Sequence, residues 1–264
     1  MTYIWRYLRL MANQQIHQKV FTALMRDIFF HKLRPGDKLP PERELSKVMD
    51  VDRTSLRVAL KQLEAMQLLD IRPGDGIYVM DFLKHAGIDF LRMLFSQDYA
   101  PEDELAVDMF MIDEVWEWWI ILFPEMIRLA VQRASSRDLK AMSDLMDSEL
   151  SHINQRNELI ELWLDQQDHI AAAVNNTVLM LLFNSSRPLR RNMLRIFLEC
   201  VGQTDLEHFI VSKKSLFMEF LMNSGKNMDA GVEQYRAILT AQRQITRSKL
   251  IQNSVPSGTA QSQE

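Results

Sequence analysis

Apolar residues recur at three- and four-residue spacing along most of the chain, which is typical of amphipathic helices. Near the N-terminus, Val20, Leu24 and Ile28 follow one another every four residues, and Phe21 and Phe29 widen the same apolar face. This periodicity, interrupted by short polar breaks, predicts helices over residues 13–31, 42–49, 53–66, 82–96, 103–133, 136–156, 158–174, 177–200, 204–223 and 229–251. The chain is therefore expected to be mainly helical.

The second and third predicted helices are short and closely spaced. In the helix over 42–49, the apolar residues Leu45, Val48 and Met49 are expected to face inward. Asp52 stands directly before the next helix, where its carboxylate can accept hydrogen bonds from free N–H groups of the first turn. A tight polar break thus separates two helices, as in a helix-turn-helix.

Two short runs of β-forming residues, 68–71 and 77–79, follow the third helix and flank a turn rich in Gly and Pro. Such a pair predicts a β-hairpin. Three helices followed by a hairpin form the layout of a winged helix-turn-helix. We predict a mainly α chain with a winged helix-turn-helix domain (three helices plus a β-hairpin) over 13–80, an all-helical bundle over 81–252 and a disordered tail over 253–264.

Charge separates the same two regions. Residues 1–80 hold 13 Lys and Arg against 9 Asp and Glu, a net of +4, and the remainder holds 18 against 26, a net of −8, which together give −4. A basic N-terminal region on an acidic body favours a small nucleic-acid-binding module joined to a second domain.

Several classes of protein are excluded by composition. No apolar run approaches the roughly 18 residues that a membrane helix needs, and the N-terminus lacks the long apolar core of a signal peptide. The single cysteine, Cys200, excludes an internal disulfide and a cysteine-rich zinc module. We expect a cytoplasmic protein without a membrane partner.

The start of the third predicted helix carries the candidate nucleic-acid chemistry. In a helix-turn-helix, the first residues of the second helix face the major groove, and here they include Arg53, Thr54, Ser55 and Arg57. Arg53 and Arg57 lie about one turn apart, so both can reach a phosphate or a guanine edge. This helix is therefore the predicted reader of DNA.

Further basic and flexible positions flank that helix. Arg43 lies near the start of the preceding helix, where it can contact the DNA backbone, and Arg72 and Gly74 lie at the hairpin tip, which can follow a minor groove. Each arginine taken alone could instead pair with neighbouring acidic residues such as Glu42 and Asp52 on a solvated surface. Four basic groups on one predicted face favour DNA binding.

Three segments resemble, in order and spacing, the GntR family of bacterial transcription regulators: LRPGDKLPPERELS (33–46), VDRTSLRVAL (51–60) and IRPGDGIYV (71–79). The resemblance covers roughly residues 13–80. It implies a homodimer that binds double-stranded DNA at a palindromic operator. It also implies DNA contacts at Arg43, Arg53, Thr54, Ser55, Arg57 and Gly74.

The helical body resembles the ligand-binding half of the FadR branch of that family through residues 163–176, WLDQQDHIAAAVNN. This resemblance implies an all-helical effector-binding and dimerisation domain over 81–252. In many relatives the Asp of this helix and the His four residues later bind a divalent metal with two later histidines, which makes Asp165 and His169 candidate effector-site residues. Only His208 lies downstream, well before the stretch near 214–215 where a ligand is expected. We therefore predict no bound metal and no cofactor, and interpret Asp165 and His169 as a buried polar pair.

A second departure from that branch concerns a position often occupied by Arg, which is Trp119 here, within the apolar segment 116–123. A pocket for a small carboxylate favours a cationic fork. This segment instead offers aromatic surface, as helix-packing core or as the lining of a pocket for an acyl chain. The expected small-molecule effector is a fatty acyl-CoA or another organic acid, and a metal-dependent sensor of a small carboxylate is the alternative.

Two functions of other classes compete with a ligand-responsive transcription regulator. The chain has no Gly-rich phosphate loop, no G-x-S-x-G and no HExxH motif, so an enzyme would rely on acid–base chemistry by Asp165 and His169. A helical scaffold that binds only protein is the other. The motifs favour a regulator that is not an enzyme, and salt-sensitive binding of promoter DNA would distinguish it from both alternatives.

Overall fold

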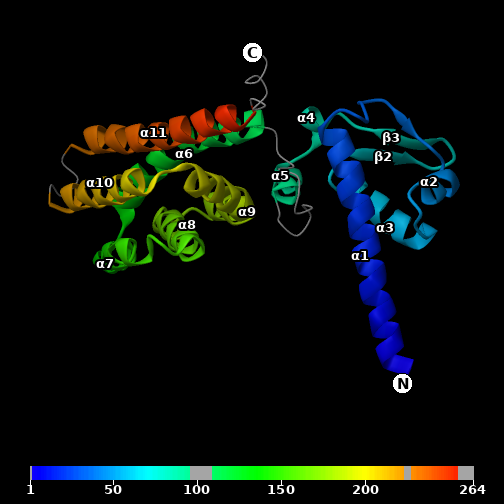
Figure 1. The fold of residues 1–264 in the computed structure, drawn as a ribbon, viewed down its shortest axis with the longest axis horizontal. Helices are drawn as coiled ribbons and strands as arrows, with labels where there is room; N and C mark the ends of the chain where they lie inside the picture. The colour runs from blue at the N-terminus through cyan, green and yellow to red at the C-terminus, as the bar shows by residue number, and fades with distance from the viewer. Residues whose placement is uncertain (1, 96–108, 223–226, 255–264) are drawn as a thin grey trace, which may run out of the picture. The chain divides into compact units, whose positions relative to one another are not determined.

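The computed structural model describes residues 2–95, 109–222 and 227–254, with side chains described over 16–95, 111–222 and 227–252. The chain divides into two compact units, residues 1–106 and 107–264. Each unit buries an apolar core of its own. Figure 1 shows the elements of each unit along the chain.

The first unit is a winged helix-turn-helix, as predicted. Its elements are α1 (Thr2–Phe29), β1 (Lys38–Leu39), α2 (Glu42–Val48), α3 (Arg53–Ala65), β2 (Leu69–Arg72), β3 (Gly76–Val79), α4 (Phe82–His85) and α5 (Ile88–Leu94). The predicted hairpin of β2 and β3 is joined by the two-residue β1, which pairs antiparallel with β3 and gives the strand order β1-β3-β2. The first helix begins at Thr2, earlier than the predicted start at Asn13.

Helices α1 and α3 pack against each other to form the core of this unit. Leu24 and Ile28 from α1 and Leu56 and Leu60 from α3 are all buried, as their spacing predicts. These contacts fix the orientation of α3, and therefore also fix which of its faces is left to solvent.

The prediction that Val48 faces inward is wrong, because its side chain is 78% exposed. The buried residues of α2 are Leu45 and Ser46. With 3.6 residues per turn, Val48 lies roughly 110° away from the midpoint of that pair. A helix of only two turns buries a narrow face, so Val48 remains outside it.

The single helix predicted over 82–96 is two helices, α4 and α5. The chain is extended at Ala86, and α5 restarts after Gly87. Both helices contribute to an aromatic cluster with α1, in which the Phe29 ring centroid lies 6.0 Å from that of Phe82 and 6.2 Å from that of Phe90. The packing of the first unit thus continues beyond residue 80.

The second unit is helical throughout its described part, as predicted. Its elements are α6 (Met109–Arg133), α7 (Ser136–Asp147), the 3-10 turn η2 (Leu150–His152), α8 (Arg156–Ala173), α9 (Thr177–Cys200), α10 (Gln203–Met222) and α11 (Met228–Ser254). Helix α11 packs along α6, α9 and α10, while α8 packs between α6, α7 and α9 (Figure 1). Most of the predicted disordered tail, from residue 255 onward, lies outside the described residues.

The starts of α7 and α9 coincide with predicted polar breaks, whereas the single helix predicted over 136–156 is wrong, because α7 ends at Asp147 and α8 begins at Arg156. Ser135 caps α7 in a reciprocal arrangement with Asp138, and the Asn176 side chain accepts a hydrogen bond from the Leu179 N–H at the start of α9.

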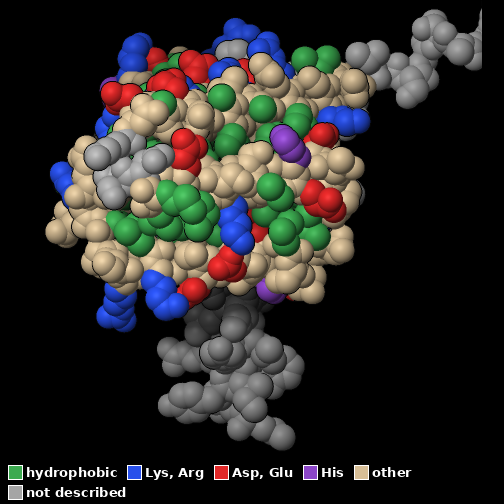
Figure 2. All heavy atoms as spheres, turned by 90° about the vertical axis from the view of Figure 1, so that its left-hand side faces the viewer, with side chains coloured by type: hydrophobic (Ala, Val, Ile, Leu, Met, Phe, Trp, Pro, Cys, Tyr) green, Lys and Arg blue, Asp and Glu red, His purple; other side chains and the backbone are tan. Residues whose placement is uncertain are grey.

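None of the helices in the described part is long and apolar enough to span a membrane. Figure 2 shows one face of the molecule, on which apolar side chains gather between charged ones; exposed apolar residues of α10 include Met218 and Met222.

Candidate nucleic-acid interface and effector cavity

The first turn of α3 is fixed by hydrogen bonds to Asp52. The Asp52 carboxylate accepts hydrogen bonds from the Ser55 hydroxyl (2.6 Å) and from the Ser55 backbone N–H (2.9 Å). The hydrogen bond from the Ser55 hydroxyl has the largest effect on the pKa of Asp52, and together with the bond from the Ser55 N–H it holds that pKa below its ordinary value of 3.8. The predicted N-cap is confirmed. Because Ser55 is only 4% exposed, its hydroxyl is used inside the protein to order the helix start.

Three of the predicted DNA-contact residues lie on the solvent side of α3. Arg53, Thr54 and Arg57 are exposed, whereas Leu56 and Ala59 are fully buried on the opposite face. The exposed side chains therefore project from a helix terminus whose opposite face is buried in the core of the unit. A helix N-terminus also attracts phosphate through its free N–H groups and its dipole.

Arg57 is paired across the helix-turn-helix. Its Nε donates a hydrogen bond to Oε2 of Glu42 on α2 at a distance of 2.7 Å, so the alternative pairing that the sequence left open is present for this arginine. The Arg57 side chain is nevertheless 67% exposed. Because exposed ion pairs contribute only about 0–1 kcal/mol, Arg57 can exchange Glu42 for a phosphate or base at small cost. Arg43, on the first turn of α2, is exposed as well.

Two cations, Lys38 from β1 and Arg72 from β2, lie over the ring of Tyr78 on β3. The Lys38 Nζ lies 5.3 Å and the Arg72 Cζ 4.4 Å from the centroid of the Tyr78 ring, and the Arg72 Nε donates to Asp70 at 2.8 Å. At the tip, Gly74 has a φ of +78°, a conformation that side chains with a Cβ adopt reluctantly. The predicted wing residues Arg72 and Gly74 are thus both exposed on a tight turn, and Lys38 extends the basic surface beside them.

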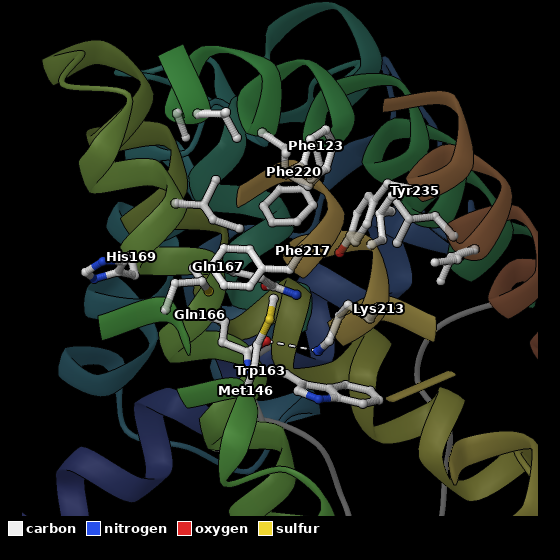
Figure 3. Close-up of a pocket in the computed structure, with 18 of the residues that line it drawn as sticks. Phe123, Met146, Trp163, Gln166, Gln167, His169, Lys213, Phe217, Phe220 and Tyr235 are labelled. Atoms are coloured by element: carbon white, nitrogen blue, oxygen red, sulfur yellow. Dashed lines mark hydrogen bonds between the residues drawn. The ribbon is translucent and has the colours of Figure 1, made fainter. Parts of the chain in front are cut away.

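The second unit contains a partly open cavity of about 110 Å³. Its wall comes from α6 to α11 and is mostly apolar and aromatic (Figure 3). Trp119, a predicted effector-site residue, lies in this wall and stacks on Phe123, with ring centroids 4.2 Å apart. The aromatic segment expected from the sequence therefore packs the core and lines a cavity at the same time.

One charged cluster lies at the cavity wall. The Lys213 Nζ is 2.6 Å from Oε1 of Glu149 and donates to Oε1 of Gln166 at 2.9 Å, and it lies 4.9 Å from the centroid of the Trp163 ring. The Gln166 amide also donates to Glu149. Glu149 is fully buried. Lysine and carboxylate thus neutralise each other beside the cavity.

The structure corrects the interpretation of Asp165 and His169 as a buried polar pair. Asp165 is exposed and bonds to Arg187 at 3.2 Å, whereas the His169 Nε2 lies 2.9 Å from the backbone oxygen of Asp138. Of the two, only His169 lines the cavity. Among the described side chains, no group of three His, Cys, Asp or Glu residues is placed to hold a metal ion.

Helices α8 and α9 are also joined by hydrogen bonds and ion pairs of Arg187 and Arg190, two residues that do not line the cavity. Arg190 is fully buried and donates to Gln167 (2.8 Å) and to Asp168 (2.7 Å). Burial, together with the nearby Arg187 charge, lowers the pKa of Arg190 to about 9, so it stays a cation at neutral pH. This network explains why Asp165 turns outward, since its partner Arg187 lies on the outer side of α9.

Several residues of the cavity were not predicted from the sequence. They include Gln166, Lys213 and Tyr235, which line the cavity on three different helices. Glu149, the ion-pair partner of Lys213, was not predicted either. The family's later metal-binding histidine, which this chain lacks, is expected near residues 214–215, and Lys213 directly precedes that position. A lysine beside an expected metal-ligand position could therefore have indicated that Lys213 faces the cavity. No sequence pattern around Glu149 indicates that it is the partner of Lys213.

Comparison with known proteins agrees with this architecture. Residues 16–79 match the family model described as "Bacterial regulatory proteins, gntR family". The "Uxu operon transcriptional regulator" of Escherichia coli is 30% identical over 184 residues, covering 69% of this chain and 67% of the relative. An uncharacterised HTH-type transcriptional regulator of Mycobacterium bovis is 28% identical, covering 67% of this chain and 70% of the relative.

Two further similarities extend over most of the chain. The "Fatty acid metabolism regulator protein" of Proteus mirabilis is 25% identical over 74% of this chain and 78% of the relative. The solved structure of Lar, which controls the agr system of Listeria monocytogenes, has a TM-score of 0.56 at 13% identity and covers 90% of this chain and 97% of that one. This last match concerns the fold alone.

Proposed function

Because the chain belongs to the GntR family of bacterial regulatory proteins and is a DNA-binding transcriptional regulator, we propose that it acts as a homodimer on a palindromic operator. In this proposal the start of α3 enters the major groove and the β2–β3 wing follows the adjacent minor groove. A small-molecule effector, a fatty acyl-CoA or another organic acid, binds the cavity of the second unit and alters DNA binding.

One observation carries the DNA-binding part. Arg53, Thr54 and Arg57 project from the capped N-terminus of α3, whose opposite face is buried against α1. A reading helix needs this combination, because base edges are discriminated by side chains held in a fixed register. Arg43 and Arg72 flank α3 in position to contact phosphates, which set the register of the protein on DNA.

The homodimer follows from the size of the reading surface. One winged head offers few base-reading side chains, and specific sites of such proteins are read by two heads related by two-fold symmetry. A palindromic operator is the DNA counterpart of that symmetry. The two half-sites are then contacted by equivalent arginines from the two subunits.

The effector part is supported by the cavity and by the names of relatives. One relative is a fatty acid metabolism regulator, and others regulate the uxu operon or the galactonate operon. The aromatic lining around Trp119 favours an apolar ligand portion over a sugar acid. An effector would act by a coupling of typically about 1–3 kcal/mol between the two sites.

Selection of binding sites from a pool of random DNA duplexes tests the proposal and identifies the operator sequence in the same experiment. We expect the full chain to enrich an inverted repeat, and to bind it more tightly than a scrambled duplex at physiological salt. Equal affinity for both duplexes at all salt concentrations would leave only non-specific phosphate binding and would contradict the proposal.

A further inference from the structure

We propose that the cavity of the second unit selects an uncharged, apolar ligand portion with one carbonyl acceptor, such as a thioester, ester or amide, and rejects a free carboxylate. This inference rests on the effector part of the proposed function. It separates the two effector classes named there, because an acyl thioester presents an uncharged carbonyl whereas an organic acid presents an anion.

The first argument is that, among the described residues, no lysine or arginine offers the cavity a free cation. Lys213 is the one Lys or Arg among the residues that line the cavity in the described part of the chain. An ammonium group has three N–H donors. Those of Lys213 face the Glu149 carboxylate, the Gln166 carbonyl and the ring of Trp163. None of the three Lys213 donors is therefore left over for a ligand carboxylate.

The second argument is that an incoming anion would disturb a buried charge. Glu149 is fully buried, and its Oε2 already lacks a hydrogen-bond partner among the described residues. A ligand carboxylate that drew Lys213 away would leave Glu149 uncompensated, which proteins tolerate poorly. Asp138 adds a further carboxylate to the cavity wall. Both anions act against a negatively charged ligand.

The third argument is that neutral hydrogen-bonding groups face the cavity. The Tyr235 hydroxyl points into it, toward Phe217 and the amide of Gln167 (Figure 3), and has no hydrogen-bond partner within the described ranges. Burial, reinforced by the Glu149 charge, raises the pKa of Tyr235, so the hydroxyl is a neutral donor under all physiological conditions. A ligand carbonyl matches this donor, while the aromatic wall accommodates an apolar chain.

The test uses octanamide and octanoate, two probes with the same alkyl chain that differ in charge. Both are titrated into the full chain, with isothermal calorimetry and tryptophan fluorescence as readouts. We expect octanamide to bind at least tenfold more tightly than octanoate. Glu149→Gln frees the Lys213 charge and should reverse that preference, whereas Glu207→Gln, the same change at an exposed position of α10, should not.

Two further variants keep the test independent of how well Glu149→Gln folds. Tyr235→Phe removes one hydrogen bond and should weaken octanamide binding about threefold to tenfold. Ala173→Phe places a ring in the cavity wall and should abolish it. The inference is overturned if wild type binds octanoate as tightly as octanamide, if neither probe binds at millimolar concentration, or if Ala173→Phe binds octanamide unchanged.

The same samples are tested for binding to the selected DNA duplex, which separates this inference from the proposed function. A protein that binds the duplex but prefers octanoate overturns the ligand class and leaves the regulator intact. A protein that prefers octanamide but binds no duplex specifically would overturn the proposed function and leave the cavity chemistry standing.

Discussion

Replacing Asp52 by Ala removes the cap of the reading helix and should cost more than a typical surface substitution. Loss of an N-cap acceptor costs roughly 1 kcal/mol. The Ser55 hydroxyl, which is 4% exposed, also loses the acceptor of its 2.6 Å hydrogen bond, at a further cost of about 1 kcal/mol. We expect Asp52→Ala to lower the free energy of unfolding, measured by urea titration, by about 2 kcal/mol.

Two companion variants resolve that total into its parts. Asp52→Asn keeps a good capping side chain and should lose well under half as much. Ser55→Ala in the Asp52→Ala background removes the unpaired hydroxyl and should recover about 1 kcal/mol. A loss below about 0.3 kcal/mol for Asp52→Ala, or equal losses for Ala and Asn, would refute this account of the helix start.

The same cap gives the stability a pH dependence of known sign. The pKa of Asp52 is lower in the folded chain than its ordinary value of 3.8, so the folded state favours the carboxylate. Its stabilisation is fully present above that ordinary value and is lost as the pH falls through the folded-state pKa. The advantage of wild type over Asp52→Asn should therefore shrink below about pH 4.

Three other outcomes are expected. Lys213→Met leaves the Glu149 carboxylate buried without its cation and should lower the free energy of unfolding, measured by urea titration, by about 3 kcal/mol. The control Lys214→Met, at an exposed ion pair, should change it by no more than about 0.5 kcal/mol. Equal losses for the two variants would contradict the buried cluster. Purified protein should hold little zinc or manganese, and a chelator should leave its melting temperature unchanged; stoichiometric metal that His169→Ala removes would show otherwise. Sedimentation at micromolar concentration should give twice the 30.9 kDa chain mass, and a monomer with and without DNA would count against the homodimer.

Local signals in the sequence were sufficient for most of the first unit. The Asp52 cap, the Pro-Gly turns and the four-residue spacing of Leu56 and Leu60 act within a few residues, so the order of elements could be predicted from them. Strand β1 was not predicted, because its two residues, Lys38 and Leu39, form a strand only through pairing with Tyr78 and Ile77. Pairing of this kind leaves no pattern in so short a segment.

The cavity depends on contacts that no local pattern reports. Apart from the break between α7 and α8, helix positions in the second unit followed from periodicity, and the aromatic segment around Trp119 suggested a lining. The ion pair of Glu149 and Lys213, however, joins residues on different elements, and only the fold brings them together. Asp165 and His169 show that a local pattern can also mislead. Their four-residue spacing predicted one shared site, but Asp165 pairs with Arg187 on α9 and its side chain does not face the cavity.

Fluorescence anisotropy of Arg53→Ala and Arg57→Ala on the selected operator and on a scrambled duplex, over a range of salt concentrations, is the most direct measurement. Both variants should fold normally, and a base-reading arginine should lose roughly 1–3 kcal/mol of operator binding per subunit with relaxed preference at one position. A phosphate-contacting arginine should instead lose affinity equally on both duplexes and reduce the salt slope by about one per contact. Arg92→Ala, an exposed arginine of α5 in the same unit, serves as the control and should bind like wild type. If Arg53→Ala and Arg57→Ala both bind the operator as tightly as wild type at physiological salt, α3 is not the reading helix.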